Sequence, residues 1–232
     1  MTIQDNLQII GERLHHAEQR FQRPLNSVQL VAVSKFHPIE SIQAAYDAGQ
    51  RAFGENYVQE MVAKAQALAE YSDLEWHFIG PLQANKTKLV AETAHWMHTL
   101  ERLKIAERLS QQRPMNYPDL NVCLQVNLSS EATKSGLQPD EVFNLAKQVQ
   151  ALPRLKLRGL MAIPAPEPDF ERQCAVFAQL RRLLEELNQQ GFALDTLSMG
   201  MSDDMEAAVA EGATIVRIGT AIFGQRPKAV TE

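Results

Sequence analysis

The chain has 232 residues, of which 45% are hydrophobic and 22% are charged, a composition that suits a large globular domain. Its net charge of −5 argues against a surface for nucleic acid or anionic membranes. Residues 1–6 show no signal-peptide pattern, and no run approaches the roughly 18 apolar residues of a membrane span. Its two distant cysteines are expected to be thiols in a reducing compartment, so the chain is expected to be cytoplasmic.

Strand-like apolar runs alternate with helix patterns along the whole chain. The predicted strands are 30–34, 51–54, 76–79, 96–100, 121–127, 155–163, 196–199 and 214–218. A helix over 3–20 precedes them, and the helices between them are 38–48, 57–69, 85–92, 102–112, 139–151, 169–190 and 203–210. Eight such units predict a single α/β domain over residues 1–232, a (β/α)8 barrel. The alternative is a doubly wound open sheet, but no G-x-G-x-x-G turn follows the first strand.

Lys35 closes the first predicted strand, directly after the run Leu30–Ser34. Burial at this place would lower the pKa of its amine, and a free amine can form a Schiff base with a carbonyl. The alternative is a strand-end lysine whose tip reaches water or a carboxylate. Alternation places Val31, Val33 and Lys35 on one side of the strand. If that side faces the barrel interior, the amine points into the mouth, where barrel enzymes carry their active sites.

The loops after the seventh and eighth predicted strands indicate a phosphate site. Gly200 and Gly219 allow close backbone approach, and Ser202 is expected to cap a helix that begins at Asp203. Thr220 is expected to begin another short turn. Backbone N–H groups at helix starts bind anions, and these two loops form the usual phosphate cradle of a barrel. Asp203 would have to point away from the phosphate, and two ordinary glycine turns with a serine cap are the alternative.

A Schiff-base lysine together with a phosphate cradle suggests pyridoxal 5′-phosphate (PLP), which carries both an aldehyde and a phosphate. Arg217, on the eighth predicted strand, could place its guanidinium near the pyridine nitrogen. Because arginine is a permanent donor, it would leave that nitrogen unprotonated and weaken the ring as an electron sink. The alternative for Arg217 is a salt bridge to an acidic residue near the barrel mouth.

Six segments, in order along nearly the full chain, resemble the pyridoxal phosphate homeostasis proteins. They are 31–35 (VAVSK), 53–60 (FGENYVQE), 76–83 (WHFIGPLQ), 158–164 (RGLMAIP), 197–203 (LSMGMSD) and 216–224 (VRIGTAIFG). The resemblance implies one barrel related to the barrel domain of alanine racemase. It also implies PLP bound covalently by Lys35, with no metal at the site.

The resemblance assigns further roles to individual residues. It implies phosphate contacts from Ser202, Gly219 and Thr220, Arg217 at the ring nitrogen, Met161 at the ring-packing position, and Asn56 and His77 in the pocket segments. Lys134 matches another family lysine that has been considered in cofactor binding or hand-over. His37 departs from the pattern, because many members carry a second lysine there, and this weakens any claim that a neighbouring amine takes part in release.

A racemase of this class needs a base on each face of the substrate α-carbon. In the related racemases the second base comes from an additional β-rich domain, whereas this chain ends soon after its eighth predicted strand. The expected function is therefore a non-catalytic carrier in PLP homeostasis, a monomer or weak dimer that passes PLP to apo-enzymes. The alternatives are a small PLP-dependent amino-acid racemase or decarboxylase completed by a neighbouring subunit, and a cofactor-free Schiff-base aldolase acting on a phosphorylated sugar.

Overall fold

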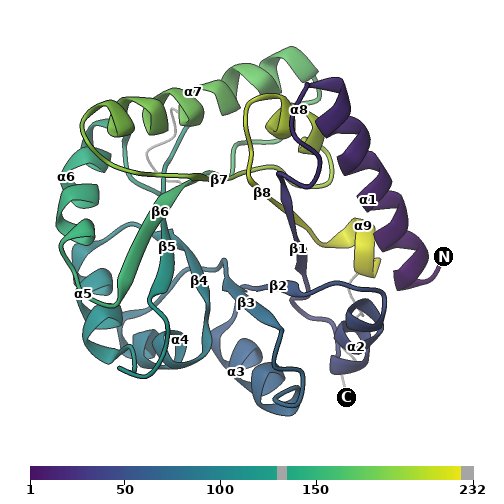
Figure 1. Cartoon of the computed structure of the whole chain (residues 1–232), viewed down its shortest axis with the longest axis horizontal. Coiled ribbons are helices and arrows are strands. Elements are labelled where there is room, and N and C mark those ends of the chain that lie inside the picture. The colour runs from purple at the N-terminus through teal and green to yellow at the C-terminus, as the bar shows by residue number, and fades with distance from the viewer. Residues whose placement is uncertain (130–134, 226–232) are drawn as a thin grey trace.

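The computed structural model, which describes residues 1–129 and 135–225, contains a closed barrel of eight parallel strands surrounded by helices (Figure 1). The strands are β1 (Gln29–Val33), β2 (Ala52–Glu55), β3 (Glu75–Phe78), β4 (Trp96–Leu100), β5 (Leu120–Gln125), β6 (Leu155–Met161), β7 (Thr196–Ser198) and β8 (Ile215–Ile218). Each strand pairs with the next one in sequence, and β8 closes the barrel by pairing with β1. The predicted (β/α)8 barrel is confirmed.

The helices lie between the strands, as the sequence predicts. They are α1 (Ile3–Arg20), α2 (Ile39–Asp47), α3 (Val58–Ala67), α4 (Thr87–Thr93), α5 (Leu103–Gln112), α6 (Pro139–Gln150), α7 (Phe170–Gln189), α8 (Met205–Ala210) and α9 (Thr220–Phe223). The helix predicted over 85–92 instead begins as a 3-10 turn, Ala84–Lys86, before α4. None of these helices combines the length and the apolar character needed to cross a membrane.

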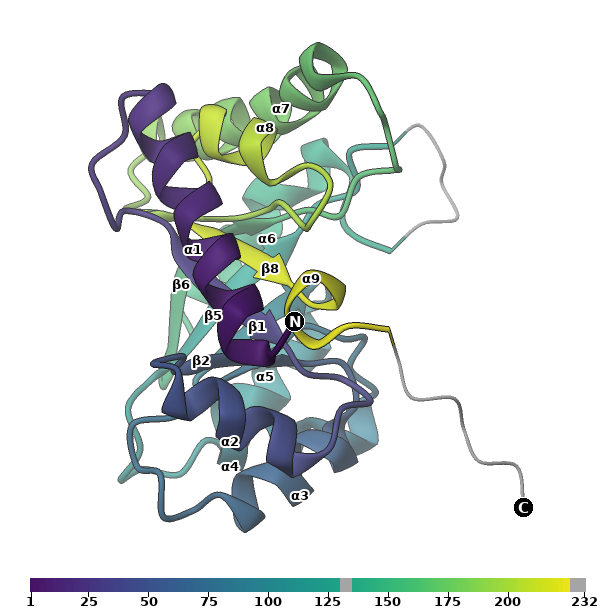
Figure 2. The same ribbon diagram turned by 90° about the vertical axis from the view of Figure 1, so that its right-hand side faces the viewer.

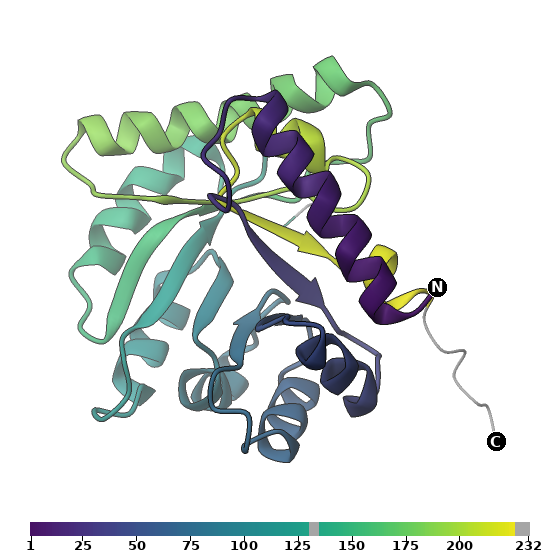
Figure 3. The same ribbon diagram turned by 45° about the vertical axis from the view of Figure 1, so that its right-hand side comes forward.

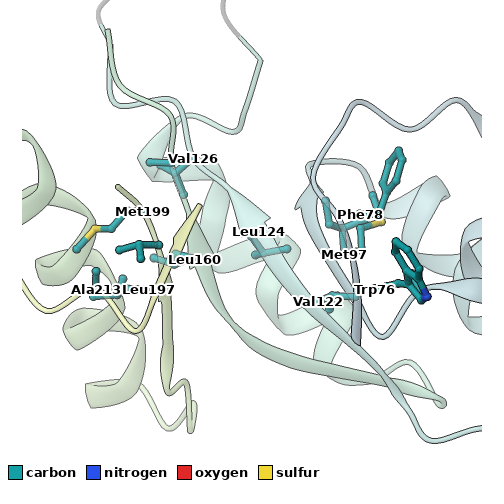
Figure 4. Packing of buried hydrophobic residues seen from close by; sticks show 14 of the residues in the cluster. Trp76, Phe78, Met97, Val122, Leu124, Val126, Leu160, Leu197, Met199 and Ala213 are labelled. Atoms are coloured by element: carbon teal, nitrogen blue, oxygen red, sulfur yellow. The ribbon is translucent and has the colours of Figure 1, made fainter. Parts of the chain in front are cut away.

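Alternation along the strands divides the apolar residues into two layers. Outward-facing residues such as Phe78, Leu124 and Leu160 are fully buried against the helices (Figure 4). Burial of each such side chain contributes about 1.5–3 kcal/mol. Inside the barrel a separate, smaller set packs together: Val31, Ala52, Trp96, Cys123, Met161 and Ile215. Polar side chains also lie inside the barrel, and they are described below.

The extra N-terminal helix supports one side of the barrel. Figures 2 and 3 show α1 running along the outside beside α8 and α9. Its Thr2 side chain accepts from the N–H of Asp5, and the Asp5 carboxylate accepts from the N–H of Thr2, which completes a capping box. Arg13 pairs with Glu206 at 2.8 Å and donates to the carbonyl of Ser202 at 3.2 Å. The helix therefore fixes the loop that follows β7.

Glu75 lies at the opposite end of the barrel, at the start of β3, and both oxygens of its partly buried carboxylate accept hydrogen bonds. It accepts from Gln29 Nε2 and from Trp96 Nε1, both at 2.7 Å. Burial alone would raise the pKa of Glu75, but the side chains of His77, Gln29 and Trp96 together lower it to about 2 from the ordinary 4.5. Ionised Glu75 therefore stabilises the fold above pH 4.5, and this stabilisation is lost as the pH falls from there towards 2.

We expect Glu75→Gln to lower the free energy of unfolding at pH 7 by about 1–3 kcal/mol, a range that allows for partial solvent screening. The difference in free energy of unfolding between the variant and the parent protein should become smaller as the pH falls through 4.5. Urea denaturation at pH 7, 5 and 4 measures this difference. Glu70→Gln, at an exposed position beyond α3, is the matched control. A difference in free energy of unfolding that stays constant across this pH range would contradict a stabilising role for ionised Glu75.

Candidate functional site

A cavity of about 570 Å³ opens at the carboxyl ends of the strands. Six of the eight predicted site residues line it: Lys35, Asn56, Ser202, Arg217, Gly219 and Thr220. Residues that the sequence analysis did not select complete the wall: Val33, Ile79, Ile163, Met201, Asp203 and Ala221. These residues follow β1, β2, β3, β6, β7 and β8, or lie at the ends of those strands. The fold therefore brings together residues that lie as far as 188 positions apart in the sequence, from Val33 to Ala221.

Lys35 lies in the turn between β1 and α2, and its side chain is partly buried. The next residue, Phe36, has a φ of 65°, a left-handed conformation that a bulky side chain seldom adopts. Such a backbone persists only where its surroundings hold it in place. The Phe36 ring lies 5.1 Å from the Tyr57 ring at the rim of the mouth. The lysine is thus presented from a constrained turn.

A buried group of charges, which we call the clamp, holds this turn from outside the barrel. It consists of Glu55 at the end of β2 and of Glu60 and Lys64 on α3. The Lys64 ammonium donates to Glu55 Oε1 and Glu60 Oε1 at 2.7 Å each, and to the carbonyl of Ser34 at 2.8 Å. Glu60 Oε1 in turn accepts from the N–H of Phe36 at 2.7 Å. The residues on both sides of Lys35 are therefore bound to the same ammonium–carboxylate group.

Glu55 is the most deeply buried member of the clamp. Its carboxylate is inaccessible to solvent, Oε1 also accepts from Ser34 Oγ at 2.6 Å, and Oε2 has no hydrogen-bond partner among the described residues. Burial raises the pKa of Glu55 above its ordinary value, although Lys64 and Ser34 oppose the effect. The ionised carboxylate therefore depends on Lys64.

The loops after β7 and β8 form the side of the cavity on which the phosphate is expected. Gly200 has a φ of 96°, and a Cβ there would lie only 2.6 Å from the Cβ of Ala208. Glycine is therefore required where the chain leaves β7. Gly219 directly precedes the short helix α9, which begins at Thr220. Both residues line the cavity, and the first N–H groups of a helix have no partner within the helix.

The predicted helix cap in the seventh loop is wrong. Helix α8 begins at Met205 with Asp204 before it, so Ser202 lies outside the helix and does not cap it. Asp204 Oδ1 instead accepts from the N–H of Met201 at 2.6 Å, which tightens the loop. Sequence reasoning placed the helix start at the first acidic residue, whereas the side chain of Asp204 supports a turn that precedes the helix. Ser202 still lines the cavity, as does the exposed Asp203.

Arg217 is 4% exposed and points from β8 into the barrel mouth. Its Nη1 donates to Ser198 Oγ at 2.7 Å, and its Nη2 donates to the carbonyl of Ala162 at 3.0 Å. Within the described residues it makes no salt bridge, so the alternative of an ion pair at the mouth does not hold there. Burial lowers the pKa of Arg217 to about 10, which still leaves the guanidinium charged at neutral pH.

Two predicted cofactor contacts lie away from the cavity wall. His77 is fully buried inside the barrel, stacked on Trp96 with their ring centroids 5.6 Å apart. Met161 belongs to the interior apolar set and is also fully buried. Asn56 does line the cavity, and its Oδ1 is buried without a hydrogen-bond partner among the described residues. An orphaned acceptor at a cavity wall is suited to a donor on a bound ligand.

Of the two remaining sequence-based expectations, one falls outside the described residues. Lys134 lies in the interval 130–134, so its part in cofactor binding or hand-over stays a prediction. His37, which stands where a second lysine was expected, is buried, and its ring lies 5.0 Å from the ring of Phe223 on α9. The aromatic contact gives His37 a packing role between α9 and the turn that carries Lys35.

Lys64, Ser198 and His98, which sequence reasoning missed, do not line the cavity but bond to residues that do, to their neighbours in the chain or, for His98, to Ser198. In the sequence, Lys64 looks like any charged residue on a helix. The residue pattern of α3 does not show that the Lys64 ammonium reaches the turn after β1. Ser198 and His98 lie on buried strands, and alternation alone marks them as inward-facing. A polar residue within a buried strand is the only signal that the sequence offers for them. It does not show that His98 on β4 contacts Ser198 on β7.

The chain is similar in sequence to proteins of one known family. The family model described as alanine racemase, N-terminal domain, matches residues 6–227. Pyridoxal phosphate homeostasis proteins of Pasteurella multocida and Vibrio cholerae are 57% and 56% identical to this chain, and each match covers 97% of it and 98% or 97% of the relative.

Solved structures show the same relationship. PipY of Synechococcus elongatus, with PLP bound, is 41% identical and has a TM-score of 0.83, with 96% of this chain and 100% of that chain covered. Alanine racemase from Corynebacterium glutamicum has a TM-score of 0.66 at 18% identity, and the match covers 96% of this chain but 62% of the racemase. At that identity the racemase supports the fold alone.

Proposed function

Because the chain belongs to the pyridoxal phosphate homeostasis proteins, a family with the alanine racemase N-terminal domain, we propose that it holds PLP as a Schiff base on Lys35 and supplies it to apo-enzymes. The chain binds PLP and takes part in PLP homeostasis. The observation that carries the proposal is the cavity itself, in which a constrained lysine faces the loops after β7 and β8.

The described residues fit this cofactor. We assign the phosphate to Ser202, Gly219 and Thr220, where the N–H groups at the start of α9 supply donors. Arg217 supplies a donor for the ring nitrogen, and the buried, unpartnered Oδ1 of Asn56 is an acceptor for a ligand donor. When bound, PLP supplies an aldehyde that condenses with an amine and releases water. His77 and Met161 would then support the site from inside the barrel.

The way in which Arg217 is held supports a carrier rather than an enzyme. A guanidinium that stays protonated gives the ring nitrogen no proton, so the ring is a weak sink for the electrons of a carbanion. We infer that the protein turns over no dedicated substrate and that its partners are PLP and, transiently, apo-enzymes. Efficient conversion of one amino acid by the pure protein would favour the racemase alternative.

The test is to record the visible absorption spectrum of the purified protein after incubation with PLP, then reduce it with borohydride and map the labelled peptide. We expect a yellow protein with one label, on Lys35. A colourless protein that takes up no PLP would contradict the proposal, and trapping of a phosphorylated sugar on Lys35 instead would favour the aldolase alternative.

We expect Asp203→Asn to strengthen retention of PLP. Asp203 is an exposed carboxylate on the wall of the cavity, so it repels the phosphate dianion. Removal of one such charge should tighten binding about two- to tenfold at low salt, and less at high salt. Equilibrium dialysis at two salt concentrations measures the change. Asp47→Asn, which removes an exposed acid at the end of α2, is the control, and equal effects of both variants would count against a phosphate near Asp203.

A further inference from the structure

A continuous series of polar side chains crosses the barrel interior from the mouth to the opposite end. We call it the interior network, and its members are Arg217, Ser198, His98, His77 and Glu75. Ser198 Oγ lies 2.7 Å from His98 Nδ1, and His98 Nε2 lies 2.9 Å from His77 Nδ1. His77 Nε2 faces Glu75 Oε2 at 3.4 Å, a longer charge–dipole contact. The three middle residues are completely inaccessible to solvent.

The two ends of the interior network fix the direction of every hydrogen bond in it. Arg217 only donates, so Ser198 Oγ accepts from it, and the hydroxyl proton of Ser198 has no acceptor other than His98 Nδ1 among the described residues. His98 Nδ1 then carries no proton, and its Nε2–H donates to His77 Nδ1. His77 in turn has its proton on Nε2, facing the carboxylate of Glu75. One arrangement of protons therefore satisfies both hydrogen bonds of His98. His77 Nε2 is buried without a hydrogen-bond partner among the described residues and meets Glu75 only through the 3.4 Å contact.

Both histidines are neutral in this arrangement. Burial lowers the pKa of His77, against the opposing effect of Glu75, and burial places the pKa of His98 well below its ordinary value. The nearby charge of Arg217 acts in the same direction on His98, as would a proton on His77. No carboxylate hydrogen-bonds Arg217 among the described residues, and the nearest acidic influence on it is the charge of Asp204, in the loop after β7. Glu75, at the other end of the interior network, lies beyond three neutral residues.

We propose that Ser198, His98 and His77 are positioning residues that orient Arg217 through neutral hydrogen bonds, so that its guanidinium keeps its full charge towards the ligand in the cavity. A carboxylate in the place of Ser198 would fix the same orientation but would neutralise the guanidinium. This inference rests on the proposed function, because it assumes that PLP occupies the cavity. It also gives His77, which does not line the cavity, a role in the site.

The first test needs no ligand. Long-range ¹H–¹⁵N spectra of the PLP-free protein report which ring nitrogen of each histidine carries the proton. We expect His77 and His98 both to carry it on Nε2 and to stay neutral between pH 7 and 8. A proton on Nδ1 of either ring, or protonation of either ring within that range, would overturn the directed series.

The second test is Ser198→Ala, which removes the hydroxyl that joins Arg217 to His98. We expect PLP to be lost at least fivefold faster, with a shifted visible absorption maximum, because Arg217 keeps only its bond to the Ala162 carbonyl. Ser198→Thr retains the hydroxyl and should restore both properties. Ser110→Ala is the control, because Ser110 is an equally buried serine whose hydroxyl bonds the Pro153 carbonyl at 2.6 Å, away from the cavity.

The outcomes distinguish failure of the proposed PLP-binding function from failure of the positioning role. If the parent protein takes up no PLP, the proposed function fails, whatever the histidine spectra show. If the parent protein binds PLP and Ser198→Ala matches Ser110→Ala in both spectrum and release rate, the proposed function stands and the positioning role is wrong.

Discussion

Lys35→Ala is expected to abolish covalent capture of PLP completely, leaving no borohydride-stable label and no visible absorption from a bound Schiff base. An alanine has no amine to condense with the aldehyde, so only the contacts to the phosphate and the ring remain. The fold should survive, since Lys35 lies in a turn at the barrel mouth and is only partly buried. A change of about 1 kcal/mol or less in the free energy of unfolding is the expected cost.

Lys35→Arg separates the chemistry from the charge. It keeps a cation at the mouth, which still attracts the phosphate, but a guanidinium that stays protonated does not form the Schiff base. This variant should retain PLP better than Lys35→Ala while showing no label. Full labelling of another lysine in either variant would mean that Lys35 is not the anchor.

Lys64→Met should cause the largest loss of stability, about 3–5 kcal/mol, because it leaves the buried carboxylate of Glu55 without its cation. The same change releases the carbonyl of Ser34 and the carboxylate of Glu60, which hold the turn around Lys35. Urea denaturation measures the first effect, and the rate of PLP uptake at a temperature where the variant is folded measures the second.

The pH dependence and a second substitution sharpen this test. Without Lys64, burial should raise the pKa of Glu55 further, so that the loss of stability is larger at pH 8 than at pH 5. Lys64→Met combined with Glu55→Gln removes the uncompensated charge and should recover part of the loss. If the double variant is no more stable than Lys64→Met, the cost arises from lost packing of the lysine stem and not from the charge.

The sequence predicts the barrel well because its signals are local. Apolar runs such as Val31–Val33 mark the strands, and the carboxyl ends of parallel strands meet at one mouth. The sequence therefore predicts that Lys35 and Arg217 lie together, and both line the cavity. The supporting residues could not be found in this way. Ser198 and His98 are 100 positions apart, and their contact depends on how the strands lie across the barrel. Met161 and His77 were assigned by resemblance, which identifies a segment but not the direction of a side chain.

The pairing of β1 with β8 has a consequence for how the protein is made on the ribosome. Lys35 follows the first strand, and the residues assigned to the phosphate follow the seventh and eighth, so the site is assembled from the earliest and the latest parts of the chain. Until β8 has been synthesised, β1 has one unpaired edge and the lysine faces no phosphate loops. Contacts this distant in sequence form late in folding. A nascent chain therefore lacks the assembled cavity, which is complete only once β8 has paired with β1.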